Sequence, residues 1–335
     1  MIAGAPKEAL WFRPEPRLTS PLPLLEKMVR TAFPHSRILA CQPCTDGFRN
    51  ANFKLRLDCS AEPMVLRIYE HDPSLCQKEV DLLRFAAAAV PVPEVIHAAP
   101  HGLEAPPFVL MRCVEGINFR ELKRNGDPEA IAQAAYSTGQ TLASIHNFTF
   151  AKPGWLGPGP RVTAPLMEGA NPVPRFIDSC LNSPNLNLRM DAELKEALHT
   201  SIWSWASPLE QLDAARCLVH GDFGKRNLLV RRVEEKWAVS AVLDWEFAVS
   251  GCGLADLGHL LRYERASRRC FEPYFSKGYV DAGGNLSKDW RNKARFLDLA
   301  ALCESLTHEQ LPDSATIELL ELVRATIENR EPNLL

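Results

Sequence analysis

The 335-residue sequence lacks any apolar run as long as a membrane span requires. Its first residues, with Lys7 and Glu8 ahead of Trp11, also lack the apolar core of a signal peptide. There is no excess of positive charge, because 38 basic residues face 41 acidic ones and the formal net charge is −3. Nucleic-acid-binding proteins normally present a basic face. We therefore expect a cytoplasmic protein with neither a membrane nor a nucleic acid as its partner.

The sequence also lacks a cysteine framework. Its ten cysteines are scattered, and Cys41-Gln42-Pro43-Cys44 is not followed by a second Cys or His pair at metal-ligand spacing. We expect free, mostly buried thiols in a reducing compartment. The chain is long enough for more than one core, and its 46% apolar and 24% charged residues are ordinary for a globular enzyme.

The most informative segment present runs from Leu218 to Glu246. Short apolar runs at 218–219 and 228–230 predict strands on either side of a loop that begins with His220-Gly221-Asp222 and ends at Asn227, and residues 237–243 predict a third strand before Asp244. Asn227 and Asp244 offer the hard oxygen ligands that Mg²⁺ prefers. Asp222 is then free to accept the proton of a hydroxyl that attacks a nucleotide phosphate. A turn and a strand end explain any one of these residues alone, but their order and setting favour a common site.

This pattern, His-Gly-Asp-x-x-x-x-Asn, then an apolar strand and Asp-Trp-Glu, resembles the aminoglycoside phosphotransferase and choline kinase-like superfamily of small-molecule kinases. The resemblance implies that Asp222 is the catalytic base and that Asn227 and Asp244 bind magnesium. It also implies ATP as the phosphate donor, with GTP as the open alternative, and a small molecule with a hydroxyl group as the acceptor.

The same resemblance implies an α+β, protein kinase-like fold with two lobes. Residues 1–111 would form the nucleotide-binding N-lobe, with an antiparallel sheet, one helix against it and a further N-terminal helix at about 22–33. Residues 112–118 would form the hinge. Residues 119–335 would form a larger, mostly helical C-lobe that holds the catalytic loop and the acceptor site.

The first half of the chain can be interpreted as such an N-lobe. Alternating and apolar runs predict strands at 38–44, 51–57, 64–69, 90–96 and 106–111. The turn between the first two strands contains Gly47 and Asn50, which we take as candidate phosphate contacts through the backbone. A plain hairpin turn is the alternative, because no GxGxxG motif is present.

Arg67 and Glu79 are the candidate cation and its partner. The family usually places a basic residue at the position of Arg67, more often lysine, and arginine offers a planar fork instead of a point charge. Ser74 to Gln77 has the form of a capping box and predicts a helix to about residue 89, with Glu79 on its apolar face. Glu79 is expected to pair with Arg67, unless it lies at the solvent edge of the helix. By the resemblance, the backbone near Met111 and Cys113 would hold the adenine.

Several neighbouring residues have open roles. Asp256 is expected to cap a helix and brace the catalytic loop, and His220 to support the loop by hydrogen bonding. Glu246 either reaches the metal or acceptor or forms a surface salt bridge. Lys225, with its neighbour Arg226, either contacts the transferred phosphate or is solvated.

The sequence leaves alternatives for the identity of the acceptor and for the class of function. An aminoglycoside would need an acidic pocket, for which Glu264, Asp289 and Glu304 are available, whereas a choline-like substrate would need an aromatic cage. A protein kinase is disfavoured, because Asp-Trp-Glu replaces Asp-Phe-Gly and no Ala-Pro-Glu follows. A protein that binds a nucleotide or metabolite without phosphate transfer is the other alternative, which Arg67 and the poor glycine turn favour.

Overall fold

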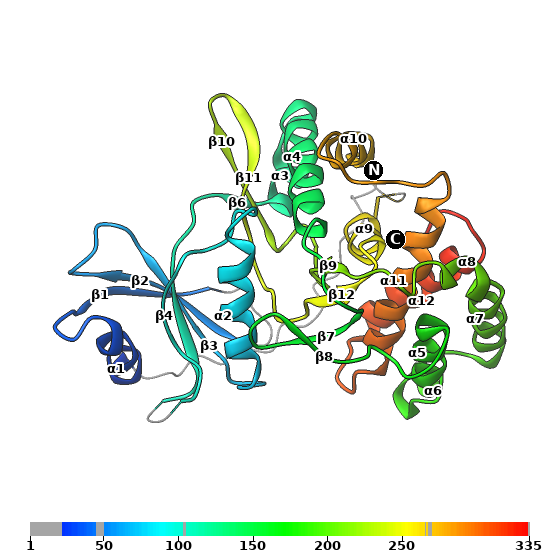
Figure 1. Ribbon diagram of the computed structural model, residues 1–335, viewed down its shortest axis with the longest axis horizontal. Coiled ribbons are helices and arrows are strands. Elements are labelled where there is room, and N and C mark those ends of the chain that lie inside the picture. The colour runs from blue at the N-terminus through cyan, green and yellow to red at the C-terminus, as the bar shows by residue number, and fades with distance from the viewer. Residues whose placement is uncertain (1–21, 45–49, 103–104, 265, 267–269, 334–335) are drawn as a thin grey trace.

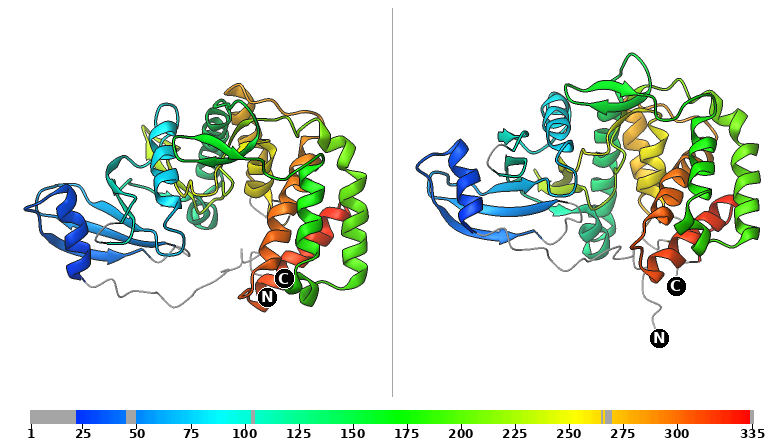
Figure 2. Two further views of the ribbon diagram at one scale, coloured as in Figure 1. Left: turned by 60° about the horizontal axis from the view of Figure 1, so that its bottom comes forward. Right: turned by 90° about the horizontal axis from the view of Figure 1, so that it is seen from below.

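The computed structural model describes residues 22–44, 50–102, 105–264, 266 and 270–333. Figure 1 shows a sheet-rich part and a helix-rich part, joined by residues 113–116. We call the described part of residues 22–112 the sheet lobe and the described part of residues 117–333 the helical lobe. Figure 2 shows the same division from two further directions.

The sheet lobe is one antiparallel sheet with a helix on each face. The strand order is β1-β2-β3-β5-β4. The strands are β1 (Ile38–Pro43), β2 (Ala51–Leu57), β3 (Met64–Ile68), β4 (Val95–Ala99) and β5 (Phe108–Arg112). The helices are α1 (Leu22–Ala32) and α2 (Leu75–Ala86).

Side chains alternate between the two faces of β3, as the pleat of a strand requires. Leu66 and Ile68 belong to the apolar cluster that also contains Met28 of α1. Tyr69 belongs to the other cluster, with Val80 of α2. The alternation therefore turns Arg67 towards the face that α2 covers.

Two local predictions in this lobe are wrong. The strand expected at 90–96 begins only at Val95, because Pro91 and Pro93 have no amide hydrogen to donate to a ladder. The capping box expected at Ser74 does not form: the Ser74 hydroxyl donates to Asp72 Oδ1 at 2.6 Å and makes no hydrogen bond to the helix. An Asp72 turn therefore starts α2.

Two small sheets of the helical lobe hold the motif segment. One has the order β11-β10-β6 and the other β8-β7-β12-β9. Their strands are β6 (Ile117–Asn118), β7 (Gly154–Gly157), β8 (Arg161–Ala164), β9 (Cys217–Val219), β10 (Leu228–Val233), β11 (Lys236–Val242) and β12 (Val249–Gly251).

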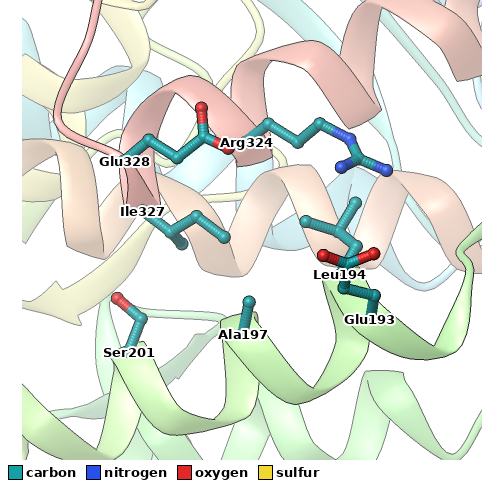
Figure 3. A pocket seen from close by; sticks show the side chains of 7 residues that line it. All are labelled: Glu193, Leu194, Ala197, Ser201, Arg324, Ile327 and Glu328. Carbon is teal, nitrogen blue, oxygen red and sulfur yellow. The ribbon is translucent and has the colours of Figure 1, made fainter.

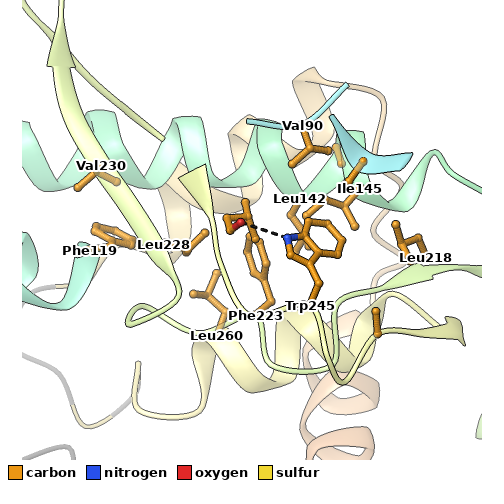
Figure 4. Close-up of a cluster of buried hydrophobic side chains, with 14 of the residues drawn as sticks. Val90, Phe119, Leu142, Ile145, Leu218, Phe223, Leu228, Val230, Trp245 and Leu260 are labelled. Carbon is orange, nitrogen blue, oxygen red and sulfur yellow. Dashed lines mark hydrogen bonds between the residues drawn. The ribbon is translucent and has the colours of Figure 1, made fainter. Parts of the chain in front are cut away.

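Helices make up most of this lobe. They are α3 (Phe119–Asn125), α4 (Pro128–His146), α5 (Pro172–Leu181), α6 (Pro184–Arg189), α7 (Ala192–Ser204), α8 (Ala206–Glu210), α9 (Leu254–Leu261), α10 (Glu272–Asp281), α11 (Trp290–Thr307) and α12 (Asp313–Ile327). One apolar cluster joins α2, α4, α9 and the motif segment, and a second joins α5, α6, α7, α11 and α12. Figure 4 shows the first cluster around Phe223 and Trp245.

Two further observations concern the whole described chain. No helix within the described ranges combines the length and the apolar character needed to cross a membrane. None of the ten cysteines, all of which lie in the described residues, forms a disulfide, and Cys41 and Cys44 are exposed. Only three of the ten are buried, so the expectation of mostly buried thiols is wrong.

Candidate active site

The loop between β9 and β10 presents Asp222. Its second residue, Gly221, has a φ of +82°, a conformation that favours glycine. A Cβ at this position would lie 2.5 Å from the carbonyl oxygen of Phe247, so a larger residue cannot fit without movement of the backbone. The Asp222 side chain keeps 36% of its surface exposed. The carboxylate is therefore accessible although its loop is anchored.

Asp222 and Asn227 are in direct contact. Asn227 Nδ2 donates to Asp222 Oδ2 at 2.8 Å and to its main-chain oxygen at 3.0 Å. Burial acts to raise the pKa of Asp222, but the side-chain contacts with His259 and Asn227 outweigh it and hold the pKa below its ordinary value. Asp222 is therefore ionised at neutral pH.

Buried polar groups of α9 and α4 hold this loop in place. Asp256 of α9 accepts the backbone N–H groups of His220 at 2.8 Å and Gly221 at 2.9 Å. His146 Nε2 lies 3.2 Å from the same carboxylate. The expected bracing by Asp256 is confirmed, but the expected helix cap is not, because Gly253 is the N-cap of α9.

His220 supports the loop as expected. Its Nε2 atom lies 2.9 Å from the carbonyl oxygen of Leu243, and its Nδ1 atom accepts the backbone N–H of Asp222 at 3.2 Å. Burial lowers the pKa of His220, so the ring is neutral with the proton on Nε2. It thereby ties Asp222 to the residue that precedes Asp244.

The segment after β11 sends alternate side chains in different directions. Asp244 has a φ of +64°, a left-handed conformation that costs a non-glycine residue about 1–2 kcal/mol. The following side chain, Trp245, is fully buried, and its Nε1 donates to Val242 O at 3.1 Å (Figure 4). Asp244 and Glu246 both reach Arg67 of the sheet lobe.

Arg67 is nearly buried and faces three carboxylates. Its Nη1 atom pairs with Asp244 Oδ1, its Nη2 atom lies 3.4 Å from Glu246 Oε2, and its Nε atom lies 3.3 Å from Glu79 Oε2. The predicted Arg67–Glu79 ion pair is therefore present. The contact between Arg67 Nε and Glu79 does not meet hydrogen-bond geometry. Arg67 is therefore better paired with Asp244 and Glu246 of the helical lobe than with α2 of its own lobe. These charges hold the pKa of Arg67 well above its ordinary value despite burial.

Glu79 and Glu246 have further partners across the two lobes. Glu79 accepts the hydroxyl of Tyr69 at 2.5 Å and the backbone N–H of Trp245 at 3.3 Å. Glu246 accepts Asn50 Nδ2 at 2.9 Å and is almost fully buried. A surface salt bridge is therefore the wrong interpretation of Glu246.

The motif-based prediction missed Lys78. This buried side chain donates to the carbonyl oxygen of Glu246 at 2.7 Å, and burial lowers its pKa to about 8. No sequence signal marks it, because neighbouring residues of a helix point in different directions and its partner is a backbone carbonyl. Solvation, one of the two alternatives for Lys225, is wrong, because Lys225 is buried and donates to Leu260 O at 2.9 Å.

The remaining nucleotide candidates are less informative. Met111 lies in β5 between β3 and β4 and packs in the core. The amide of Cys113 donates to Pro63 O at 3.1 Å, which leaves its carbonyl as the group able to contact an adenine. Gly47 lies outside the described residues.

The three acidic acceptor candidates do not converge. Glu264 is buried and pairs with Lys123 at 3.0 Å. Asp289 precedes α11 and Glu304 is near its other end, so a rise of about 1.5 Å per residue separates them by roughly 20 Å. A cavity of about 200 Å³ between α7 and α12, with Arg324 and Glu193 in its lining, contains none of the predicted site residues (Figure 3).

Comparisons of the sequence with known proteins identify its family. A model of the phosphotransferase enzyme family matches residues 40–296. Hygromycin-B 4-O-kinase of Escherichia coli is 22% identical over 264 residues, which are 77% of this chain and 73% of that protein. Acyl-CoA dehydrogenase family member 11 of Gallus gallus is 27% identical over 234 residues, which are 67% of this chain but only 28% of that protein. The chain thus spans under a third of this longer relative.

Solved structures with the same fold include two aminoglycoside phosphotransferases. APH(4)-Ia has a TM-score of 0.68 at 18% identity, and the match covers 91% of this chain and 98% of that one. The GDP and kanamycin complex of APH(2")-IIia has a TM-score of 0.67 at 17% identity with the same coverage. The predicted α+β, kinase-like fold is therefore confirmed.

Proposed function

This chain belongs to the phosphotransferase enzyme family, and from that premise we propose that it is an ATP- and Mg²⁺-dependent kinase of a small hydroxylated molecule. Membership of the family supports transfer of phosphate to a hydroxyl group as the activity. The activity, the nucleotide, the metal ion and the roles of individual residues are all part of the proposal.

Asp222 is the proposed catalytic base. Its carboxylate is ionised, partly exposed and held by Asn227. It orients the acceptor hydroxyl and takes its proton as the oxygen attacks the γ-phosphorus and the bond to the nucleoside diphosphate breaks. Because the transition state of phosphoryl transfer is loose, the orientation of the hydroxyl contributes more than its deprotonation.

Asn227 and Asp244 are the proposed magnesium ligands. Both fit, because the two hydrogen bonds of Asn227 Nδ2 to Asp222 turn its Oδ1 atom away from that residue and Asp244 keeps 34% of its side chain exposed. Hard oxygen donors of these two kinds suit Mg²⁺. A magnesium ion held there supplies charge neutralisation on the phosphate oxygens.

Arg67 is the proposed phosphate contact. It now pairs with Asp244, so it binds a phosphate only when Asp244 exchanges Arg67 for another cation. Glu79 and Glu246 keep the guanidinium in place during this exchange. Asn50 and the backbone at Gly47 are further proposed phosphate contacts. The backbone near Met111 and Cys113 is the proposed adenine contact.

The observation that carries the proposal is the contact between Arg67 and Asp244. It joins the cation of β3 to the end of β11, 177 residues later. Since His220 and Leu243 connect the same end of β11 to Asp222, the residues proposed as base, metal ligands and phosphate contact belong to connected segments, which supports the proposal.

A panel of acceptors tests the proposed function. Amino alcohols, sugars and aminoglycosides, including hygromycin B and kanamycin, are each incubated with Mg·ATP, and formation of ADP and of the phosphorylated acceptor is followed. We expect transfer to at least one acceptor, lost in Asp222→Asn and without Mg²⁺. Binding of nucleotide with no acceptor-dependent ADP would instead identify a binding protein without transfer activity.

A further inference from the structure

Each of the two carboxylate oxygens of Asp222 lies close to a side-chain nitrogen of a different element. Asn227 of the loop donates to Oδ2, and His259 Nε2 of α9 lies 3.1 Å from Oδ1. No part of the sequence motif includes His259. We propose that His259 is a positioning residue for the base, which in its neutral, Nε2-protonated tautomer fixes the orientation of the Asp222 carboxylate. This inference rests on the proposed function of Asp222.

Arg262 determines the tautomer of His259. Its Nη2 atom lies 3.2 Å from His259 Nδ1, and a guanidinium can only donate hydrogen bonds. Nδ1 must therefore act as the acceptor, which leaves the ring proton on Nε2, the atom that faces Asp222. The proton on Nε2 is therefore on the side of the ring that faces the carboxylate, with Nε2 3.1 Å from Oδ1.

Asp298 fixes Arg262 in turn. The guanidinium donates from Nε to Asp298 Oδ2 at 2.8 Å and from Nη2 to Oδ1 at 2.7 Å. Such a two-point ion pair is geometrically specific. Both side chains are nearly buried. The relay Asp298–Arg262–His259–Asp222 therefore runs from the core of the helical lobe to the exposed carboxylate.

The relay leaves His259 no nitrogen with which to act as a base itself. Nδ1 accepts from Arg262, and Nε2 faces Asp222. With Asn227 bonded to Oδ2 and His259 beside Oδ1, rotation of the carboxylate about its Cβ–Cγ bond is restricted. The role we assign to His259 is therefore to orient Asp222, and the hydroxyl proton passes to Asp222.

Gly224 makes room for this ring. A Cβ built on Gly224 would lie 3.2 Å from His259 Nε2, closer than most Cβ contacts, although the φ of Gly224 lies outside the left-handed region. Gly224→Ala is therefore compatible with the backbone and pushes directly on the ring. It offers a way to disturb the relay without altering any of its four side chains.

The kinetic test compares His259→Leu, His259→Gln and Gly224→Ala in the full chain. Glutamine can donate its amide N–H to Asp222 and accept from Arg262 through its oxygen, whereas leucine can do neither. A misplacement of about 1 Å costs on the order of 10² in rate, so we expect His259→Leu to lower kcat about 10- to 100-fold with the KM for ATP unchanged. We expect His259→Gln to stay within about threefold of the wild type and Gly224→Ala to fall between them.

His199→Leu is the matched control. His199 also faces an aspartate, Asp178, at 3.7 Å, but on α7 and α5, away from the motif. We expect its kcat to match the wild type. Equal kcat for His259→Leu and the wild type, or equal losses for His259→Leu and His259→Gln, would overturn the proposal.

A second measurement does not depend on phosphate transfer. In the ¹⁵N NMR spectrum of the full chain, we expect the imidazole nitrogens of His259 to show the neutral tautomer with the proton on Nε2 at pH 7.5. A proton on Nδ1 would contradict the relay. If no acceptor is phosphorylated but the Nε2–H tautomer is found, the proposed function fails while the relay stands.

Discussion

The two sides of the site hold their charged groups in different ways. On the helical-lobe side, Asp222 is oriented by Asn227 and His259, which belong to the same lobe. On the sheet-lobe side, Arg67 is nearly buried, and two of its three carboxylate partners, Asp244 and Glu246, come from the other lobe. One side therefore depends on contacts within a lobe and the other on contacts between lobes.

This difference separates two kinds of defect. A change beside Asp222 alters the orientation of the base and should reduce turnover with little effect on stability. A change at Arg67 or Lys78 leaves buried charges or a buried carbonyl without a partner in the opposite lobe, and it should reduce stability as well.

Asp244→Asn should have the largest effect on activity, because it removes the charge of a proposed metal ligand and a partner of Arg67 together. We expect a loss of transfer greater than the range of about 10²–10⁴ typical for removal of a general base. The measurement is the transfer rate over a series of Mg²⁺ concentrations, and excess Mg²⁺ should not restore it. A higher transfer rate for Asp244→Asn than for Asp222→Asn would contradict the proposed role of Asp244 as a metal ligand.

Arg67→Met should cause the largest loss of stability. Glu79 and Glu246 are both nearly buried, and removal of one partner of a buried ion pair costs about 3–5 kcal/mol. Asp244 stays partly hydrated and contributes little to this loss. Urea unfolding measures the change, with Arg67→Lys as the control that keeps the charge and should lose less. Equal stability of Arg67→Met and the wild type would contradict the cluster.

Lys78→Met should change how stability depends on pH. Burial lowers the pKa of Lys78 to about 8 in the folded chain, against an ordinary value of 10.5. Between these values the unfolded chain binds more protons at this site, so the contribution of Lys78 to the free energy of unfolding rises with pH. The rise amounts to roughly 3 kcal/mol and should vanish in Lys78→Met.

The control for this prediction is Lys236→Met, since Lys236 is exposed on β11. Unfolding free energies are measured by denaturant titration at several values from about pH 7.5 to pH 10.5. Parallel curves for the wild type and Lys78→Met would show that Lys78 is not buried as a charge between the lobes.

The sequence allowed those parts of the site to be predicted that depend on local spacing. The strand-loop-strand setting of Asp222 and Asn227 follows from short apolar runs around a turn, and Glu79 follows from its place on an amphipathic helix. The Arg67–Glu79 pair joins adjacent elements, and the place of Glu79 on the apolar face of its helix, with the family resemblance, was enough to suggest it.

The contacts that were missed join distant segments. Lys78 reaches Glu246 across 168 residues, and no local pattern marks a lysine whose partner is a backbone carbonyl. His259 lies three residues after Asp256, on the same side of α9, but only the packing of that helix under the loop brings it to Asp222. The strand expected at 90–96 failed because apolar content was given more weight than Pro91 and Pro93.

The most direct test of the account is the rate of phosphate transfer by Asp222→Asn beside the wild type, with the best acceptor of the panel and saturating Mg·ATP. We predict that kcat falls by about 10²–10⁴ while the affinity for Mg·ATP, measured by calorimetry, stays within about twofold, because asparagine keeps the shape of the side chain and removes only its charge. An unchanged kcat would contradict the assignment of Asp222 as the base.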